Sequence, residues 1–270
     1  MGKVANATEN PVMINAVPPK INPALGDYTL LFSAVLIVWE VTAMAVGSTT
    51  ISSPWSAFTE AGRLLMSSDF QPNVFSTMRA FGIATGITIV GGTVIGLLLG
   101  ANRLLGDAYE PMLMSLYTVP KVAFFPVILL IFGIGLSAEV AFGVIHGILP
   151  VAIFTINAVR NIRRVFIKTA SALGLSPAMT AMTVLLPSIA PEVFTGVRVG
   201  ISLTFIGVIL SEMFGSHQGI GYLLMQAIGL SNGSLIMALT VLIVGFALTL
   251  NGVLSWLNRR LDHQTAASFA

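Results

Sequence analysis

The sequence predicts an all-α integral membrane protein with six transmembrane helices. Of its 270 residues, 55% are hydrophobic and only 9% are charged, whereas a soluble domain is about 25% charged. The mean hydropathy is +0.91. Six stretches are also long and apolar enough to cross the bilayer, which takes about 20 residues of helix. The bilayer is therefore the expected environment, and the formal charge of +2 indicates neither nucleic acid nor an acidic partner.

The six predicted spans follow one another along the chain, with polar links between them. We expect them at residues 28–47, 74–101, 112–132, 140–159, 191–214 and 234–257. Residues 1–27 are polar and contain no apolar core of the signal-peptide type, so they are predicted to be a retained, flexible cytoplasmic tail. The first span and its external linker then occupy 28–73, a core of five spans occupies 74–258, and 259–270 form a cytoplasmic C-terminal tail.

The links differ in composition and predict different local structures. The linker 48–73 includes Trp55 and Phe58 among polar residues, which is typical of a helix lying at the membrane interface. The stretches 102–110 and 215–233 are polar and are expected to be loops. Residues 133–139 are expected to form a tight, glycine-rich turn.

Positive charge is concentrated on one side of the predicted bundle. An even number of spans places both termini on the same side, and nine of the thirteen Lys and Arg residues fall there. They are Lys3, Lys20, Arg103, Arg160, Arg163, Arg164, Lys168, Arg259 and Arg260. Because cytoplasmic loops carry an excess of Lys and Arg, both termini and segment 160–190 are predicted to be cytoplasmic.

Glycine recurs at four-residue spacing within several predicted spans. The repeats are Gly82/Gly86, Gly92/Gly96/Gly100, Gly143/Gly147 and Gly196/Gly200. Small residues at this spacing let helix backbones approach each other in a membrane. We interpret these glycines as packing contacts within the bundle and not as a substrate site.

Segment 160–190 is a partly polar stretch between two long apolar runs. Within it, residues 161–173 carry apolar side chains at three- and four-residue spacing, which predicts an amphipathic helix. Gly174 follows and suits the position that ends a helix, where positive φ is common. A first short helix closed by a glycine turn is therefore expected.

A second short helix is expected to begin after that turn. Ser176 followed by Pro177 is a helix start signal, and Pro187 and Pro191 are expected to stop the helix before the next span. Two short helices joined at a glycine outside the membrane can insert into a groove on a partner protein. The alternative is an interfacial helix pair that binds lipid headgroups through its basic residues.

Segment 168–187 resembles the cytoplasmic EAA loop of ATP-binding-cassette (ABC) importer permeases, whose pattern is E-A-A-x-x-x-G, nine residues, then I-x-L-P. Gly174 and Leu186-Pro187 occupy the corresponding positions. Further similar motifs follow in unbroken order over about residues 70–258: FSTMR at 75–79, YTVPKVAFFP at 117–126, FGIG at 132–135, TGVR at 195–198, SEM at 211–213 and GIGY at 219–222. Together they resemble the nitrate/sulfonate/taurine branch of the binding-protein-dependent importers.

The resemblance implies that segment 160–190, between the fourth and fifth spans, is the coupling-helix loop that docks an ATPase. The predicted docking residues are Arg163, Arg164, Lys168, Thr169, Ala170, Gly174, Leu175, Ser176 and Pro187. Lys168 and Thr169 depart from the motif, because the family has Glu and Ala there. Either the partner's groove carries an acidic residue opposite Lys168, or Lys168 faces water or lipid headgroups.

The function that the resemblance implies is that of the transmembrane subunit of an ATP-driven, binding-protein-dependent importer of a small anionic solute. The expected partners are two copies of a cytoplasmic ABC ATPase, a second permease copy in a homodimer, a periplasmic or surface solute-binding protein and the lipid of a bacterial inner membrane. No nucleic acid is expected. The sequence has no GxxxxGK[ST] phosphate loop, so ATP and Mg are expected on the partner and no cofactor on this chain.

Two other classes of protein match the sequence less well. A secondary transporter driven by an ion gradient needs repeats and broken helices in matching halves, and no clear repeat is visible. An intramembrane enzyme needs a catalytic constellation, but the sequence has neither a GxSxG nor an HExxH motif. It also has no cysteine, which excludes a thiolate metal site or nucleophile. No catalytic residue and no metal ligand are predicted.

Ionisable side chains at the bilayer centre cost about 2.5–3.5 kcal/mol each, so each needs a reason. Lys121 is expected near the midplane in a helix kinked by flanking prolines. It either lines a path for an anion, or pairs with a carboxylate or snorkels from the bundle. Phe124 belongs either to a gate or to the core, and Glu212 either faces the outer gate or pairs with Arg79. Lys121, Phe124 and Glu212 are the candidate residues of the translocation path.

Overall fold

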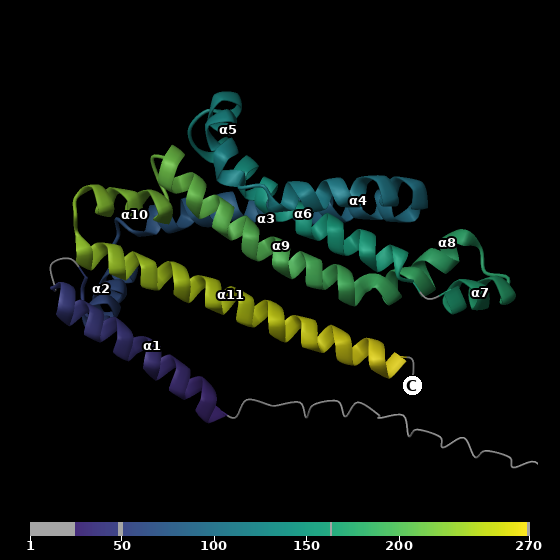
Figure 1. The fold of residues 1–270 in the computed structure, drawn as a ribbon, viewed down its shortest axis with the longest axis horizontal. Coiled ribbons are helices and arrows are strands. Elements are labelled where there is room, and N and C mark those ends of the chain that lie inside the picture. Colours follow the sequence, from purple (N-terminus) through teal and green to yellow (C-terminus); the bar gives the residue numbers. More distant parts are fainter. Residues whose placement is uncertain (1–24, 48–50, 163, 269–270) are drawn as a thin grey trace, which may run out of the picture.

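The computed structural model describes residues 25–47, 51–162 and 164–268, and all regular secondary structure within them is helical (Figure 1). In chain order the elements are α1 (Leu25–Val46), α2 (Pro54–Met66), α3 (Gln71–Ala101), α4 (Arg103–Thr118), the 3₁₀ turn η1 (Lys121–Phe124), α5 (Phe125–Phe132), α6 (Leu136–Arg160), α7 (Arg164–Ala172), α8 (Pro177–Thr180), the π-helical turn η2 (Ala181–Leu185), α9 (Leu186–Gly215), α10 (Ile220–Gly229) and α11 (Gly233–Ser268). The all-α class is confirmed for these residues.

Five helices of the described residues are long and apolar enough to cross a membrane. They are Thr29–Val46, Gln71–Ala101, Leu136–Arg160, Ala181–Gly215 and Gly233–Asn258. A sixth crossing depends on α4 and the η1–α5 segment, which meet at a bend of 86°. The third span predicted at 112–132, with a kink at its prolines, is interrupted by this sharp bend. α4 already occupies most of the stretch 102–110 that was expected to be a loop.

Local sequence accounts for both ends of α4. Asn102 Oδ1 accepts hydrogen bonds from the N–H groups of Leu104 and Leu105 at 3.0 and 3.3 Å, which caps the start of the helix. At the other end, Val119 and Pro120 are extended, with ψ of 134° and 95°. The residue before a proline avoids the α region, and Pro120 has no N–H with which to continue the helix.

Helices α3, α6 and α9 form the centre of the bundle, and glycines hold them close together. A Cβ added at Gly147 would overlap Thr204 Oγ1 and would lie 2.6 Å from the carbonyl oxygen of Gly200. Comparable close contacts occur at Gly92, Gly96, Gly100, Gly143, Gly196 and Gly200. The predicted packing role is confirmed at these positions. It is wrong within this chain for Gly82 and Gly86, where no described atom lies within 4 Å of an added Cβ.

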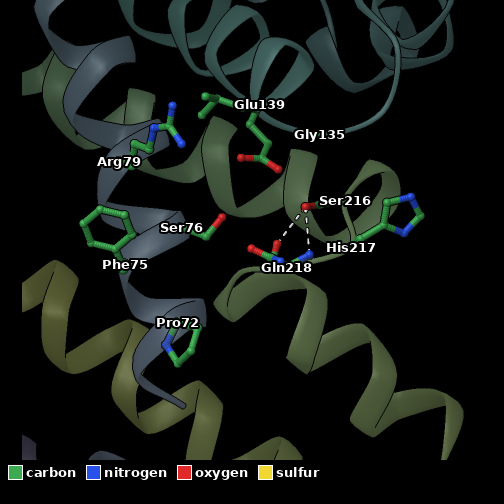
Figure 2. Close-up of a pocket in the computed structure, with 10 residues that line it drawn as sticks. Pro72, Phe75, Ser76, Arg79, Gly135, Glu139, Ser216, His217 and Gln218 are labelled. Atoms are coloured by element: carbon green, nitrogen blue, oxygen red, sulfur yellow. Dashed lines mark hydrogen bonds between the residues drawn. The ribbon is translucent and has the colours of Figure 1, made fainter. Parts of the chain in front are cut away.

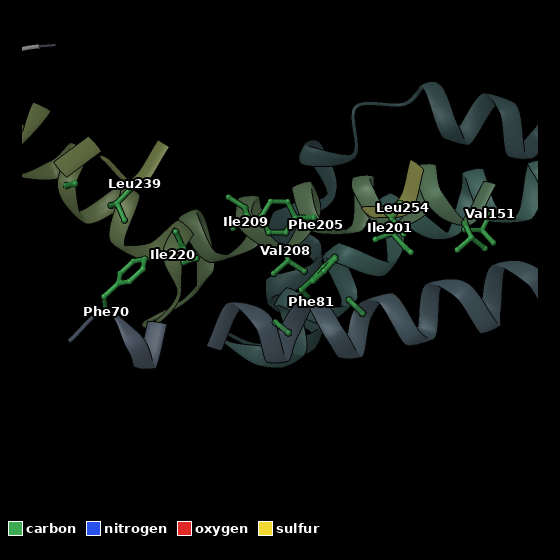
Figure 3. Close-up of a cluster of buried hydrophobic side chains, with 14 residues drawn as sticks. Phe70, Phe81, Val151, Ile201, Phe205, Val208, Ile209, Ile220, Leu239 and Leu254 are labelled. Atoms are coloured by element: carbon green, nitrogen blue, oxygen red, sulfur yellow. The ribbon is translucent and has the colours of Figure 1, made fainter. Parts of the chain in front are cut away.

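Aromatic side chains join α11 to this centre. The rings of Phe81 and Phe205 lie 5.4 Å apart at 77°, and both side chains belong to the buried cluster drawn in Figure 3. Phe246 of α11 lies 4.8 Å from Phe205 and 6.1 Å from Phe81. Aromatic pairs favour such edge-to-face and tilted arrangements, so the cluster fixes α11 against α3 and α9.

The remaining elements lie at the edge and at the two ends of the bundle. Only 6% of the α1 span is buried, and Trp39 Nε1 donates a hydrogen bond to Ser52 O at 3.1 Å. The helix expected in the linker 48–73 does form, as α2, whereas α10 occupies the stretch 215–233 that was expected to be a loop. α2 and α10 lie at one end of the bundle, and α7, α8 and the C-terminal end of α11 lie at the other (Figure 1).

Candidate functional site

The docking segment lies between α6 and α9 and has the helix–turn–helix form that the sequence predicts. Gly174 adopts φ +65° after α7, and the N–H of Leu175 donates to Ala170 O at 3.1 Å. This is the left-handed turn that commonly closes a helix and favours glycine. Ser176 Oγ then accepts from the N–H of Met179 at 3.3 Å, which caps the next helix. The predicted turn and helix start are confirmed.

The surface of this segment is both apolar and charged. Lys168 and Thr169 are exposed, and Ala170 is buried. The exposed apolar side chains are Val165, Leu173, Met179 and Met182. Exposed apolar patches with polar neighbours mark interaction sites, and contact with an ATPase stays a prediction for this surface. Arg163 and the side chain of Arg164 lie outside the described residues.

Pro187 does not end the second helix, and neither does Pro191. α8 continues through η2 and α9 without interruption. In η2 the N–H of Leu186 donates to Ala181 O, five residues back. This wider turn changes the hydrogen-bond register just before Pro187, which supplies no N–H to the helix. The predicted stop is therefore wrong, and the docking segment is continuous with α9.

Lys121 and Phe124 both lie in η1, directly after the bend. Lys121 Nζ donates to Tyr117 O at 2.9 Å and lies 4.8 Å from the centre of the Tyr117 ring. A cation is favourable at a helix C-terminus, so α4 itself supplies this contact. The described residues contain no ion pair of Lys121 with a carboxylate. Phe124 is exposed and Phe125 is buried, so Phe124 is not a core residue. The role of Lys121 and Phe124 in translocation stays a prediction.

Glu212 is completely buried, and its side chain contacts the start of α10. Three consecutive backbone N–H groups donate to side chains of other helices, and we call this arrangement the α10 cap. Its contacts are Gly219 N–H to Asn73 Oδ1, Ile220 N–H to Thr77 Oγ1 and Gly221 N–H to Glu212 Oε2, each at 2.9 Å. The first N–H groups of a helix have no partner within it, and a carboxylate is favourable there. Glu212 thus joins α9 to α10.

A cavity of about 320 Å³ lies beside the loop that leads into α10 (Figure 2). Arg79 lines it from α3 and Glu139 from α6. Arg79 forms no ion pair among the described residues, so the predicted pair with Glu212 is wrong. Glu139 is 2% exposed, and its Oε2 has no hydrogen-bond partner there. The sequence did not reveal Glu139, because it falls at the end of the stretch 133–139 expected to be a turn.

A second charged cluster was also missed. Arg160, the last residue of α6, forms ion pairs with Asp107 and Glu110 of α4. Both acids fall in the stretch 102–110, and only its helical structure places them on one face. No group of three His, Cys, Asp or Glu residues that could hold a metal ion occurs in the part of the chain that the structure describes.

Residues 92–266 match the protein family described as the inner membrane component of binding-protein-dependent transport systems. The match spans well over half of the sequence. The chain belongs to this family. It is therefore a permease subunit of an ABC importer and not an enzyme, because ATP hydrolysis in these importers resides in a separate subunit. The resemblance seen in the motifs is confirmed.

Several import permeases are similar to this permease over most of their length. The nitrate import permease NrtB of Synechococcus elongatus is 25% identical over 254 residues, covering 89% of this chain and 91% of the relative. The bicarbonate transport permease CmpB of the same organism is 28% identical over 239 residues, covering 83% and 84%. A putative aliphatic sulfonates transport permease, SsuC of Bacillus subtilis, is 26% identical over 205 residues, covering 73% of each.

Solved importer structures share the fold of this permease. An inward-facing form of the MetNI methionine ABC transporter superposes with a TM-score of 0.60 at 20% identity, covering 70% of this chain and 94% of that chain. The crystal structure of an amino acid ABC transporter with histidines gives a TM-score of 0.58 at 16% identity, covering 75% of this chain and 96% of that chain. At these identities the likeness concerns the fold alone, and it agrees with the helical permease architecture.

Proposed function

We propose that this permease forms the translocation path for a small anionic solute and couples it, by alternating access, to ATP hydrolysis on a partner. The observation that carries the proposal is the docking segment, a capped helix–turn–helix with an exposed apolar and basic surface at one end of the bundle. The solute class is supported by the relatives, which are named for nitrate, bicarbonate and sulfonates.

In the proposed assembly, two permease copies share the path and two ABC ATPases contact the two docking segments in the cytoplasm. A solute-binding protein delivers the solute at the opposite end. ATP-driven closure of the ATPases displaces the docking segments and opens the path outwards, and hydrolysis resets it. The gathering of α7, α8 and the C-terminal end of α11 at one end (Figure 1) agrees with a cytoplasmic face at that end.

Gly174 offers a direct test of docking. Its φ is +65°, and no described atom lies within 4 Å of an added Cβ, so a substitution there strains only the backbone. A side chain in this region costs about 1–2 kcal/mol, or about 5–30-fold in an equilibrium, and Asn is tolerated better than β-branched residues. We expect Gly174→Val to reduce ATPase co-purification and ATP-dependent uptake, and Gly174→Asn to retain both. Retention by both variants would argue against docking. Uptake that persists without the ATPase would indicate a secondary transporter.

Lys168 separates two interpretations of the same surface. Lys168→Glu restores the residue that the family motif carries at this position. If the ATPase groove is acidic opposite Lys168, less ATPase should co-purify with this variant, because the two like charges repel each other. If ATPase retention is unchanged, Lys168 faces water or lipid headgroups.

A further inference from the structure

Helix α4 packs against the ends of α3 and α6 and buries little of its own surface. Gly106 is the only buried residue of α4. A Cβ at Gly106 would lie 3.0 Å from Leu99 O and 3.4 Å from Arg160 Cδ. A side chain at this position would be tight against the backbone of α3 and against the Arg160 side chain.

Arg160 also binds two acidic residues of α4 that follow Gly106 in the helix. One guanidinium nitrogen, Nη1, donates to Glu110 Oε2, and the other, Nη2, donates to Asp107 Oδ1. The two acids are three residues apart, which places them on one face of the helix. The planar guanidinium presents two donors in a fixed geometry. Arg160 therefore engages both acids at once and fixes the rotation of α4 as well as its distance.

Arg160 also lies at the start of the docking segment. It is the last residue of α6, and the non-helical Asn161 and Ile162 follow directly. At its other end α4 leads through the bend into η1, which carries Lys121 and Phe124. One ion-pair cluster, the Arg160 clamp, thus lies between the segment that meets the ATPase and the helix that ends at the candidate path.

We propose that Arg160 is a positioning residue that makes α4, and with it η1, follow ATP-driven movement of the docking segment. This inference rests on the proposed function. When the docking segment is displaced, the end of α6 moves with it, and the Arg160 clamp carries α4 along. Without the clamp, α4 keeps its connection to α3 through Asn102 and its packing around Gly106, but its rotation against α6 is no longer fixed, so η1 no longer follows the docking segment.

The experiment uses the complex of the full chain with its co-purifying ATPase in nanodiscs. The sequence contains no cysteine, so Ala123→Cys in η1 and Met179→Cys in the docking segment can each be the single reactive thiol. The rate of labelling by a membrane-impermeant maleimide is measured with and without ATP and vanadate. In the otherwise unchanged chain we expect ATP to change both rates by about fivefold or more, equivalent to 1 kcal/mol of coupling.

In Arg160→Gln the ATP-dependent change at Ala123→Cys should fall below about twofold, while that at Met179→Cys stays near its original value. Arg160→Lys keeps the charge but not the two-pronged geometry, so an intermediate change is expected. Asp107→Asn combined with Glu110→Gln removes the acidic partners on α4 and should give the same labelling result as Arg160→Gln. Arg103→Gln is the matched control, because Arg103 lies at the start of the same helix and forms no ion pair among the described residues.

Each result separates the two proposals. If the folded Arg160→Gln complex shows an undiminished ATP-dependent change in labelling at Ala123→Cys, the clamp proposal is overturned. It is also overturned if, with Arg160 retained, ATP changes labelling at Met179→Cys but not at Ala123→Cys. If Arg160→Gln fails to fold, the Asp107→Asn/Glu110→Gln result decides in the same way. Absence of any ATP response at Met179→Cys in the unchanged complex would instead overturn the proposed docking function.

Discussion

The α10 cap makes a quantitative prediction about Glu212. In Glu212→Ala the N–H of Gly221 loses its only side-chain acceptor in a fully buried position. An unsatisfied buried donor costs about 1–3 kcal/mol. A difference of 1.4 kcal/mol corresponds to a factor of ten, so local opening at the start of α10 should become about 5–150-fold more frequent.

Hydrogen exchange of residues 219–223, followed by mass spectrometry in nanodiscs, measures this opening directly. Glu212→Gln should exchange nearly as slowly as the original chain, because its carboxamide oxygen can still accept from Gly221. Glu60→Ala is the control: Glu60 forms only an exposed ion pair with Arg63 at 3.3 Å, which contributes about 0–1 kcal/mol and lies on α2. Unchanged exchange in Glu212→Ala, or equal acceleration in Gln and Ala, would refute the hydrogen-bond argument.

The remaining predictions concern packing and charge. Gly147→Ala should lower the thermal unfolding midpoint, since its Cβ would overlap Thr204 Oγ1 and overpacking costs about 1–3 kcal/mol. Gly82→Ala, with open space at its Cβ, should leave the midpoint unchanged or raise it slightly, because Ala favours a helix over Gly by about 1 kcal/mol. A midpoint in Gly147→Ala that is not below the midpoint of the original chain would contradict the packing role. Lys121→Gln should slow anion uptake about tenfold or more, the loss expected for a charged hydrogen bond, while Lys121→Arg retains uptake and both retain the ATPase. Normal uptake by Lys121→Gln would remove Lys121 from the candidate path.

Local signals were enough to predict the parts of the docking segment that depend on neighbouring residues. The turn at Gly174 needs only a positive φ and one hydrogen bond back to Ala170, and the cap by Ser176 reaches three residues forward. Both were read correctly from short motifs. The effect of Pro187 was not, because a π-helical turn in the preceding residues accommodates it, and no residue preference announces such a turn.

Non-local contacts explain the errors in the rest of the chain. The segment around Gly219 and Gly221 has loop-like composition, yet α10 begins there because Asn73 and Thr77, more than 140 residues earlier, accept its N–H groups. The glycines also have a steric reason, since a Cβ at either position would meet Glu212 or its neighbours. Pattern reading along the chain cannot supply such partners. Glu212 was therefore recognised as important but assigned the wrong partner.

The arrangement of the close contacts suggests how force from an ATPase would divide within the bundle. The glycine contacts join α3, α6 and α9 so closely that they have little freedom to slide, since packed interiors are not continuously deformable. The docking segment connects α6 to α9 and is continuous with α9, so a pull on it acts on this block as a whole. α4 lies outside the block with a single buried residue. On the proposed mechanism, the block moves as a rigid body, α3 carries the start of α4 with it through Asn102, and Arg160 fixes the rotation of α4 so that η1 follows the same movement.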